Sequence, residues 1–318
     1  MIQVPMTASS LAASRYAVSR VSETLDALRV LVGTADGRHL QRWTRWVRPR
    51  IHDARAAGLD LTLLHALLRT GGYVPDFLTP APSGVDRPFE ADLEELVATP
   101  ADRVRAEIDL AYKGRPLPVR LEMALADGEA ALLAQTAEAL RGFWRVAVQP
   151  WWPGIQELLD DDIAYRARVT ARRGAAAAFG QMHPALWWDD GCLHISATDA
   201  VAADWVDHGV VFSPSLFGGP QLYMSLQPWL RTVVYYPVRT MTAGLPLIPD
   251  PGGTGQAELI GHTRARILRQ LERPQTTVDL ASRLGLSPST VSYHLGVLYR
   301  AGLLDRRRER RRVLYTRV

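Results

Sequence analysis

Hydrophobic residues recur at helical spacing through the first 180 residues of the chain. The first stripe consists of Val21, Leu25, Leu28, Leu31 and Val32 and should end at Gly33. Further stripes begin at Leu40, at Leu61 and directly after Thr99-Pro100. Two more cover 119–146 and 154–173. Pro49 should end the second helix, and the residues 75–88 should form a loop. Thr99 should cap a later helix, with Pro100 at its first position. The pattern predicts a helical region over residues 1–180.

The pattern changes after residue 180. Ala185–Trp188 and Cys192–Ser196 have the composition of two strands around the turn Asp189-Asp190-Gly191. Val210–Ser213 and Thr232–Val238 are rich in β-branched and aromatic residues and predict further strands. We therefore expect a small β region over 181–244.

A proline- and glycine-rich stretch at 245–257 predicts a linker, and a different pattern follows it. Residues 258–272 form an amphipathic helix, and a short helix capped by Thr276 or Thr277 comes next. Gly285 suits a tight turn, and Ser287-Pro288 begins a third helix, which Gly302 ends. Two strands then flank the basic run 305–312. The predicted fold class is α+β, mainly α, with an N-terminal domain over 1–244 and a winged helix-turn-helix over 258–318.

Charge is distributed unevenly along the chain. The net charge is +4 overall, yet residues 261–318 alone hold 13 arginines against four acidic residues, a net charge of +9. Residues 1–260 carry a net charge of −5. A compact basic end on an acidic body indicates a polyanion as the partner of that end.

The third C-terminal helix has an outer face of small polar groups. Val291, Leu295 and Leu298 share its inner face. Small hydroxyl side chains on the outer face would allow close approach to a major groove, and the arginine hairpin would follow the phosphate backbone. The expected contacts to double-stranded DNA are Ser287, Ser289, Thr290, Ser292, Tyr293 and His294 on the helix, and Arg306, Arg307, Arg308, Arg310, Arg311 and Arg312 on the wing.

Residues Arg264–Val318, with the run STVSYHL at 289–295, closely resemble the DNA-binding domain of ArsR-type bacterial transcriptional regulators. The resemblance implies a homodimeric regulator, more often a repressor than an activator, that reads a pseudo-palindromic site. ArsR-type metal sensors often carry two cysteines where this chain has Thr276 and Val278, so that thiolate site is absent. We expect no counterpart of the family's usual dimer helix after the wing, and therefore expect dimer contacts from the N-terminal domain instead.

The N-terminal domain is similar to a long region of unassigned function found in some ArsR-like proteins. The segments that carry this similarity are RYAVSRVSETLDALRVL and WWPGIQELLDDDIAYRARV. All nine tryptophans precede Leu230. Trp151, Trp152, Trp187 and Trp188 are candidates to line a pocket for an apolar or aromatic effector. Packing in the core or at a dimer interface is the alternative, and so is a scaffold that a partner protein controls.

Signals for other function classes are weak. One cysteine excludes a disulfide framework and a multi-thiolate metal site. We find no Walker or Rossmann glycine pattern, no Gly-x-Ser-x-Gly, and no histidine spacing typical of a metal site. Neither an apolar run long enough to span a membrane nor a signal peptide stands out. We therefore expect a cytoplasmic DNA-binding protein that is not an enzyme and needs no metal or cofactor.

Overall fold

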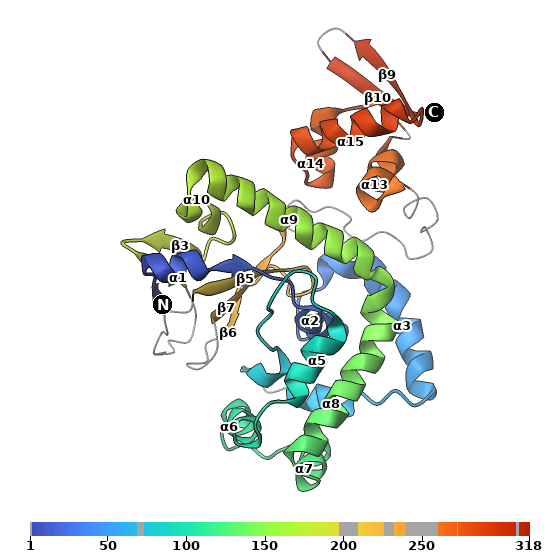
Figure 1. Ribbon diagram of the computed structural model, residues 1–318. Helices are drawn as coiled ribbons and strands as arrows, with labels where there is room; N and C mark the ends of the chain where they lie inside the picture. Colours follow the sequence, from blue (N-terminus) through green and yellow to red (C-terminus); the bar gives the residue numbers. More distant parts are fainter. Residues whose placement is uncertain are drawn as a thin grey trace. The chain divides into compact units, whose positions relative to one another are not determined.

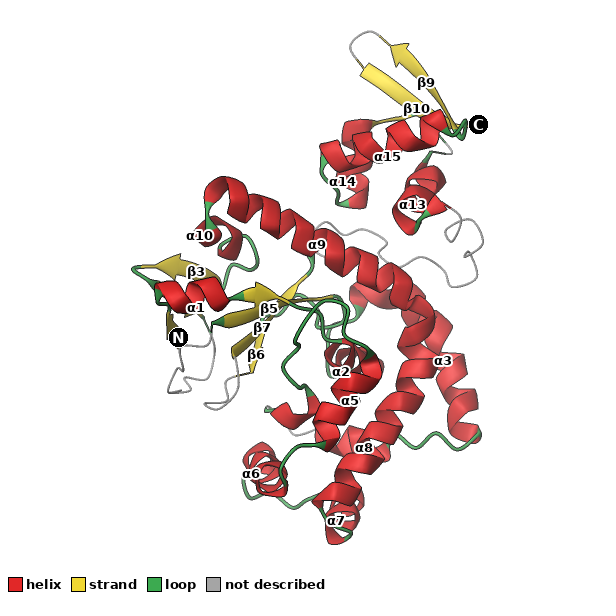
Figure 2. Ribbon diagram, viewed as in Figure 1, coloured by secondary structure: helices red, strands yellow, loops and turns green. Residues whose placement is uncertain are grey.

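The computed structural model describes residues 2–68, 73–196, 209–225, 232–239, 260–271, 273–309 and 312–318. It is a mixed α+β structure in which helices dominate, as the sequence predicts (Figure 2). The chain divides into two compact units, one of Met1–Pro150 with Val169–Pro237 and one of Trp151–Arg168 with Val238–Val318. The predicted linker at 245–257 lies outside the described residues.

The helical part of the first unit is built from amphipathic helices with buried leucine faces. Ser19 begins one of them, since its side chain accepts a hydrogen bond from the backbone N–H of Ser22 at 3.0 Å. The helices are α1 (Ala8–Ala13), α2 (Arg20–Leu31), α3 (Gln41–Ala56), α4 (Thr62–Leu68), α5 (Phe89–Val97), α6 (Ala101–Tyr112), α7 (Val119–Ala126), α8 (Glu129–Phe143) and α10 (Ala175–Phe179), with a π-helical turn at Trp144–Val148 and 3-10 turns at Arg38–Leu40, Asp76–Leu78 and Gln149–Trp151.

Two expected helix boundaries are wrong. Helix α3 continues through Pro49, which therefore lies inside it and not at its end. A proline removes only one backbone donor, and the buried Trp43 and Val47 anchor the helix on the core in spite of that loss. Helix α6 is preceded by Pro100 in extended conformation, and Thr99 does not cap it.

Two sheets complete the first unit. The larger has the strand order β2-β5-β7-β6, with bounds Arg15–Tyr16, Val210–Ser215, Thr232–Pro237 and Tyr223–Ser225. Strands β2, β5 and β7 run parallel, and β6 is antiparallel to β7 (Figure 1). The side chains of β5 are buried along its whole length, and its first half, Val210–Phe212, is entirely apolar.

The smaller sheet has the order β1-β4-β3. Strands β3 (Leu186–Asp189) and β4 (Cys192–Ile195) form the predicted hairpin, and Asp190 and Gly191 both have positive φ, as its tight turn requires. The third strand, β1 (Ile2–Pro5), pairs with β4 and was not predicted. The first 180 residues are therefore not wholly helical, because Arg15–Tyr16 also joins a sheet.

The second unit has its own apolar core. Its elements are the first part of α9 (Trp152–Arg173), α13 (His262–Gln270), β8 (Gln275–Thr276), α14 (Thr277–Leu284), α15 (Pro288–Arg300), β9 (Leu304–Glu309) and β10 (Arg312–Arg317). Leucines of α13, α14 and α15 pack together with Leu304 at the start of β9. Strands β8, β10 and β9 form an antiparallel sheet, of which β8 was not predicted.

Candidate nucleic-acid interface

A tight turn joins helices α14 and α15. Gly285 adopts a left-handed conformation with φ of 66°, and the Leu286 N–H donates to the carbonyl of Ala281 at 3.0 Å. This is the conformation that the position of Gly285 predicts, because a residue with a Cβ would be strained there. The Leu286 side chain enters the apolar core and orients the start of α15.

Side-chain caps define where both helices begin. Thr276 and Asp279 form a reciprocal capping box at α14, and hydrogen bonds from Thr276 lower the pKa of the Asp279 carboxyl. At α15, Ser287 accepts a hydrogen bond from the Thr290 N–H at 3.1 Å, and Pro288 occupies the first turn. Both helix starts are therefore specified locally, as their sequences predict.

Helix α15 presents an apolar face to the core and a polar face to solvent. Val291, Leu295 and Leu298 are fully buried. On the other side Ser289 and Ser292 are exposed, and Tyr293 keeps 61% of its surface accessible. The small serines and the projecting phenol leave room for a close approach to a groove edge.

The remaining expected contacts on α15 are less exposed. The hydroxyl of Ser287 lies 2.7 Å from the Thr290 hydroxyl, and both residues are half-buried. His294 is also half-buried, with its ring edge-on to Tyr293 at 5.3 Å. Burial and the positive charge of Arg264 lower the pKa of His294, which favours its neutral form. Each of these three side chains is therefore only partly accessible for the predicted contact to DNA.

Strands β9 and β10 form a basic hairpin beyond α15 (Figure 1). Paired residues of an antiparallel hairpin share a face, and neighbours along a strand alternate. Arg306 lies opposite Tyr315, and Arg308 lies opposite Val313. This Arg306/Arg308 face holds no acidic residue among the described positions.

The other face of the hairpin is partly neutralised. Arg307 forms an ion pair with Glu309, and Arg312 lies opposite Glu309 in the register. The expected contacts Arg310 and Arg311 lie outside the described residues. The structure thus divides the wing arginines into two faces of different net charge, which the sequence analysis did not distinguish.

An aromatic residue links the helix face to the Arg306/Arg308 face. Tyr299, near the end of α15, is 40% exposed, and the Arg306 guanidinium carbon lies 4.8 Å from its ring centroid. Tyr299 was not among the predicted contacts. Its position seven residues after the exposed Ser292, about two helical turns, is the signal that could have found it.

Residues outside the helix-turn-helix also contact the turn between α14 and α15. Arg239 donates to the carbonyl of Gly285, and its backbone N–H donates to Oδ1 of Asp162 at 3.0 Å. The Arg239 guanidinium also lies 4.2 Å from the ring centroid of Tyr165 on α9. Within the second unit, the early part of α9 thus connects to the turn through one arginine.

The four tryptophans proposed as pocket residues are divided between the two units. Trp151 and Trp152 are buried in the second unit, whereas Trp187 and Trp188 belong to the first. Trp188 packs on the core of the small β region, and Trp187 faces outward and stacks on His194 at 5.3 Å. Trp187 and Trp188 thus face opposite sides of β3, as predicted for neighbours along a strand.

Two family models match parts of the chain. A model described as a helix-turn-helix domain matches residues 262–307, and a model for a family of unknown function, DUF5937, matches residues 131–242. The chain carries a helix-turn-helix domain. No curated protein and no solved structure matches it. The first match covers α13, α14, α15 and the start of the hairpin, which agrees with the DNA-binding role predicted for them.

Of the helices that the structure describes, none has the length and apolar character needed to cross a membrane. Among the described residues, no three or more histidine, cysteine, aspartate or glutamate side chains stand close enough to hold a metal ion.

Proposed function

We propose that this protein is a cytoplasmic, sequence-specific transcriptional regulator that acts as a homodimeric repressor. The observation that carries the proposal is one exposed surface in the second unit. It begins with the serines and Tyr293 of α15, passes Tyr299, and ends with the Arg306/Arg308 face of the hairpin. The match to a helix-turn-helix domain supports this role, and the resemblance of Arg264–Val318 to ArsR-type regulators supports repression.

The two parts of the surface suit two kinds of contact. Ser289, Ser292 and Tyr293 can donate and accept hydrogen bonds at base edges, so they are our candidates for sequence reading. The hairpin arginines bear fixed charge and would neutralise phosphates whatever the sequence. In the proposed complex α15 lies in the major groove, and the wing contacts the adjacent backbone.

One binding experiment tests the assignment. Full-length protein is titrated onto a labelled duplex from upstream of its own gene, with random duplex as competitor, at several salt concentrations. The pair Arg306→Gln/Arg308→Gln should weaken binding to both duplexes and reduce the slope of log K against log salt by about two, because each lost phosphate contact removes about 0.9. The matched pair Arg307→Gln/Arg312→Gln should change the slope less, since Glu309 already offsets that face.

A second variant in the same assay separates sequence reading from charge. Ser292→Ala/Tyr293→Ala should reduce discrimination between operator and random duplex and leave the salt slope unchanged. Equal losses on both duplexes would contradict base reading by α15. An unchanged salt slope in both arginine pairs would contradict the role of the wing.

Dimerisation and effector control complete the proposal. One recognition helix reads few base pairs, and a second copy of the chain supplies the matching half-site. The first unit would then provide dimer contacts, respond to a small molecule, or do both. Control by a partner protein, without any ligand, is the competing possibility.

A further inference from the structure

Helix α3 of the first unit is a basic element in an acidic part of the chain (Figure 1). Residues 1–260 have a net charge of −5, yet α3 alone holds five arginines against one aspartate, a net charge of +4. A local excess of positive charge on an otherwise negative body indicates an anionic partner for this helix.

The basic residues of α3 are arranged in a row. Positions 41, 45, 48, 52 and 55 follow one another at alternating spacings of four and three residues, so they share one face of the helix. All five residues are exposed. The α3 basic face consists of Gln41, Arg45, Arg48, His52 and Arg55. From Arg45 to Arg55 it is about 15 Å long, which matches the rise of about four base pairs of a duplex.

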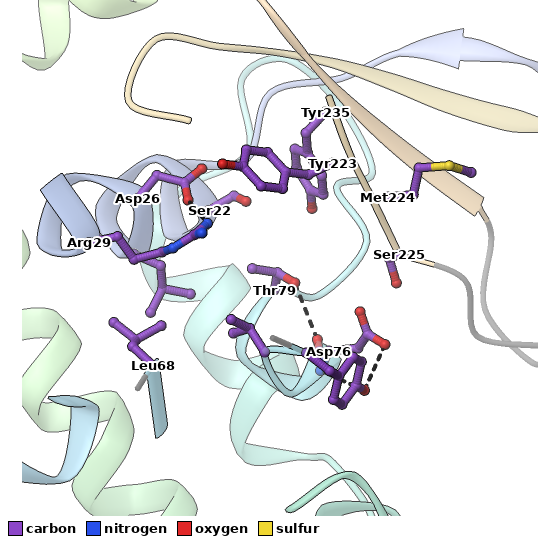
Figure 3. Close-up of a pocket in the computed structure, with 13 residues that line it drawn as sticks. Ser22, Asp26, Arg29, Leu68, Asp76, Thr79, Tyr223, Met224, Ser225 and Tyr235 are labelled. Carbon is purple, nitrogen blue, oxygen red and sulfur yellow. Dashed lines mark hydrogen bonds and ion pairs between the residues drawn. The ribbon is translucent and has the colours of Figure 1, made fainter. Parts of the chain in front are cut away.

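The arginines of the α3 basic face are not neutralised. In the part of the chain that the structure describes, none of the three has a side-chain hydrogen bond or an ion pair. Other arginines of the first unit are paired. Arg29, beside a cavity of about 210 Å³, lies 3.0 Å from Asp26 (Figure 3), and Arg105 forms an ion pair with Glu129. The charge of the α3 basic face is therefore available to an external anion.

An open hollow of about 390 Å³ borders one end of this face. Arg45 and Arg48 line it together with Gln41 and Thr44, which add amide and hydroxyl donors. Arg38 lines it too, although an aspartate already pairs with that side chain. A guanidinium binds phosphate oxygens through two parallel N–H bonds. The hollow has room for a phosphate group and the waters around it.

The apolar face of α3 is already in contact with the core. Trp43 and Val47 are buried, and Nε1 of Trp43 donates to the carbonyl of Ala147 at 2.8 Å. A helix that lies on a membrane buries its apolar face in the lipid, and here that face is not available. The contacts left to α3 are electrostatic, and a row of charges suits the evenly spaced phosphates of a nucleic acid.

We propose that the α3 basic face is a second DNA-binding surface, which binds phosphates of a duplex without reading its sequence. Arg45 and Arg48 make the principal contacts, and Arg55 extends them along the helix. The proposal goes beyond the role assigned to the helix-turn-helix and rests on it only for the choice of duplex DNA as the anion.

Titration of the full chain onto a labelled random-sequence duplex tests this surface, with fluorescence anisotropy as the readout at several salt concentrations. Arg45→Gln/Arg48→Gln should reduce the slope of log K against log salt by about two, because each lost phosphate contact removes about 0.9. The loss of affinity between about 50 and 200 mM salt should then be about twelvefold smaller than in the unmodified chain. An unchanged slope would overturn the proposal.

The matched control is Arg105→Gln/Arg145→Gln. It removes the same charge from exposed positions of the same unit, but these arginines are paired with Glu129 and Glu138. Its slope should change by less than about 0.5. A change as large as that of the α3 pair would assign the effect to net charge alone and overturn the surface. Glutamine is nearly as good a helix former as arginine, and circular dichroism verifies that each variant is folded.

Combination with the wing variants separates this inference from the proposed function. Arg45→Gln/Arg48→Gln in the Arg306→Gln/Arg308→Gln chain should lower the slope by about two more, because the two surfaces bind phosphates independently. The α3 pair alone should leave the preference for operator over random duplex within about twofold of that of the unmodified chain. A slope that responds only to the wing pair would remove the α3 surface and leave the regulator. A slope that responds only to the α3 pair would do the reverse.

Anionic vesicles provide the test against a membrane. Vesicles with about one-third phosphatidylserine should not sediment the unmodified chain more than the Arg45→Gln/Arg48→Gln chain. Vesicle binding that requires these two arginines, together with an unchanged DNA salt slope in the variant, would identify a lipid surface as the partner and overturn the proposal.

Discussion

Glu23, in the first unit, is a carboxyl group almost completely removed from water. It accepts hydrogen bonds from the backbone N–H groups of Leu216 and Phe217, 193 and 194 residues further along the chain. Burial raises the pKa of Glu23 to about 8, although these hydrogen bonds and the Ser215 hydroxyl lower it. One side chain on α2 therefore fixes the turn after β5, and its protonation is coupled to folding.

The pH dependence of stability follows from this shift. A carboxyl whose pKa is higher in the folded state binds its proton more tightly there, so its contribution is complete below about pH 4.5 and is lost as pH rises to about 8. Glu23→Gln keeps an acceptor oxygen but cannot titrate. The unfolding free energy of the unmodified chain should fall relative to that of Glu23→Gln by about 1.4 kcal/mol per pH unit in this window.

Urea unfolding followed by circular dichroism between pH 5 and pH 8 measures the difference. Glu122→Gln, at an exposed position of α7, is the control and should run parallel to the unmodified chain. A stability difference between Glu23→Gln and the unmodified chain that does not change with pH would show that Glu23 has the same pKa in the folded and unfolded states.

At the scale of elements, the helix-turn-helix contains two glycines with opposite requirements. Gly285 ends α14 at φ of 66°, where a side chain is strained. Gly296 lies inside α15, and a Cβ added there would come no closer than 3.5 Å to Nη1 of Arg300, an ordinary contact. One position needs glycine for its backbone conformation, and the other does not.

Alanine at these two positions should therefore change stability in opposite directions. Gly285→Ala should destabilise the domain by about 1 kcal/mol, because alanine pays the cost of a left-handed conformation. Gly296→Ala should stabilise it by roughly 0.5 to 1 kcal/mol, because alanine favours a helix interior. Thermal unfolding of the two variants measures both effects, and destabilisation by Gly296→Ala would mean that its face is packed and not free.

Gly296 also bears on the proposed interface, since it is half-buried and lies between the exposed residues Tyr293 and Arg300 of α15. An added methyl group increases the distance of closest approach between helix and groove. A variant that is more stable and yet binds the operator more weakly would place this helix face against DNA.

At the scale of the whole molecule, the chain carries a helix-turn-helix domain at residues 262–307. If the chain acts as a homodimer, its recognition helices should reach two half-sites about one helical turn apart, roughly 10 base pairs from centre to centre. Chemical footprinting on the operator should then show two protected regions with this spacing.

The control for this prediction is a change of spacing. Inserting about half a helical turn, roughly 5 base pairs, between the half-sites should abolish the joint footprint, because the second half-site then faces the opposite side of the duplex. A single protected region that tolerates the insertion would contradict binding as a dimer. Sedimentation of the free protein at the same concentrations reports its oligomeric state independently.

Local sequence signals account for much of the second unit. Ser287 with Pro288, the Thr276–Asp279 box and Gly285 act over a few residues, so the helix starts and the turn could be predicted from neighbours alone. The same holds for the hairpin around Asp190-Gly191, whose turn requires positive φ. Where local signals competed with packing, as at Pro49, the sequence prediction failed because a buried helix face outweighed one lost hydrogen bond.

The sequence by itself determined the helix-turn-helix, its basic hairpin and the uneven charge of the chain, because these depend on residues close together along it. Only the tertiary structure decided the rest. Register separated Arg306 and Arg308 from the neutralised face of the hairpin, and pairing with β4 made a strand of Ile2–Pro5. Folding brought Arg29, Asp76 and Tyr223 around one cavity. Periodicity records which face of an element is buried, but it contains no information on which distant element covers that face.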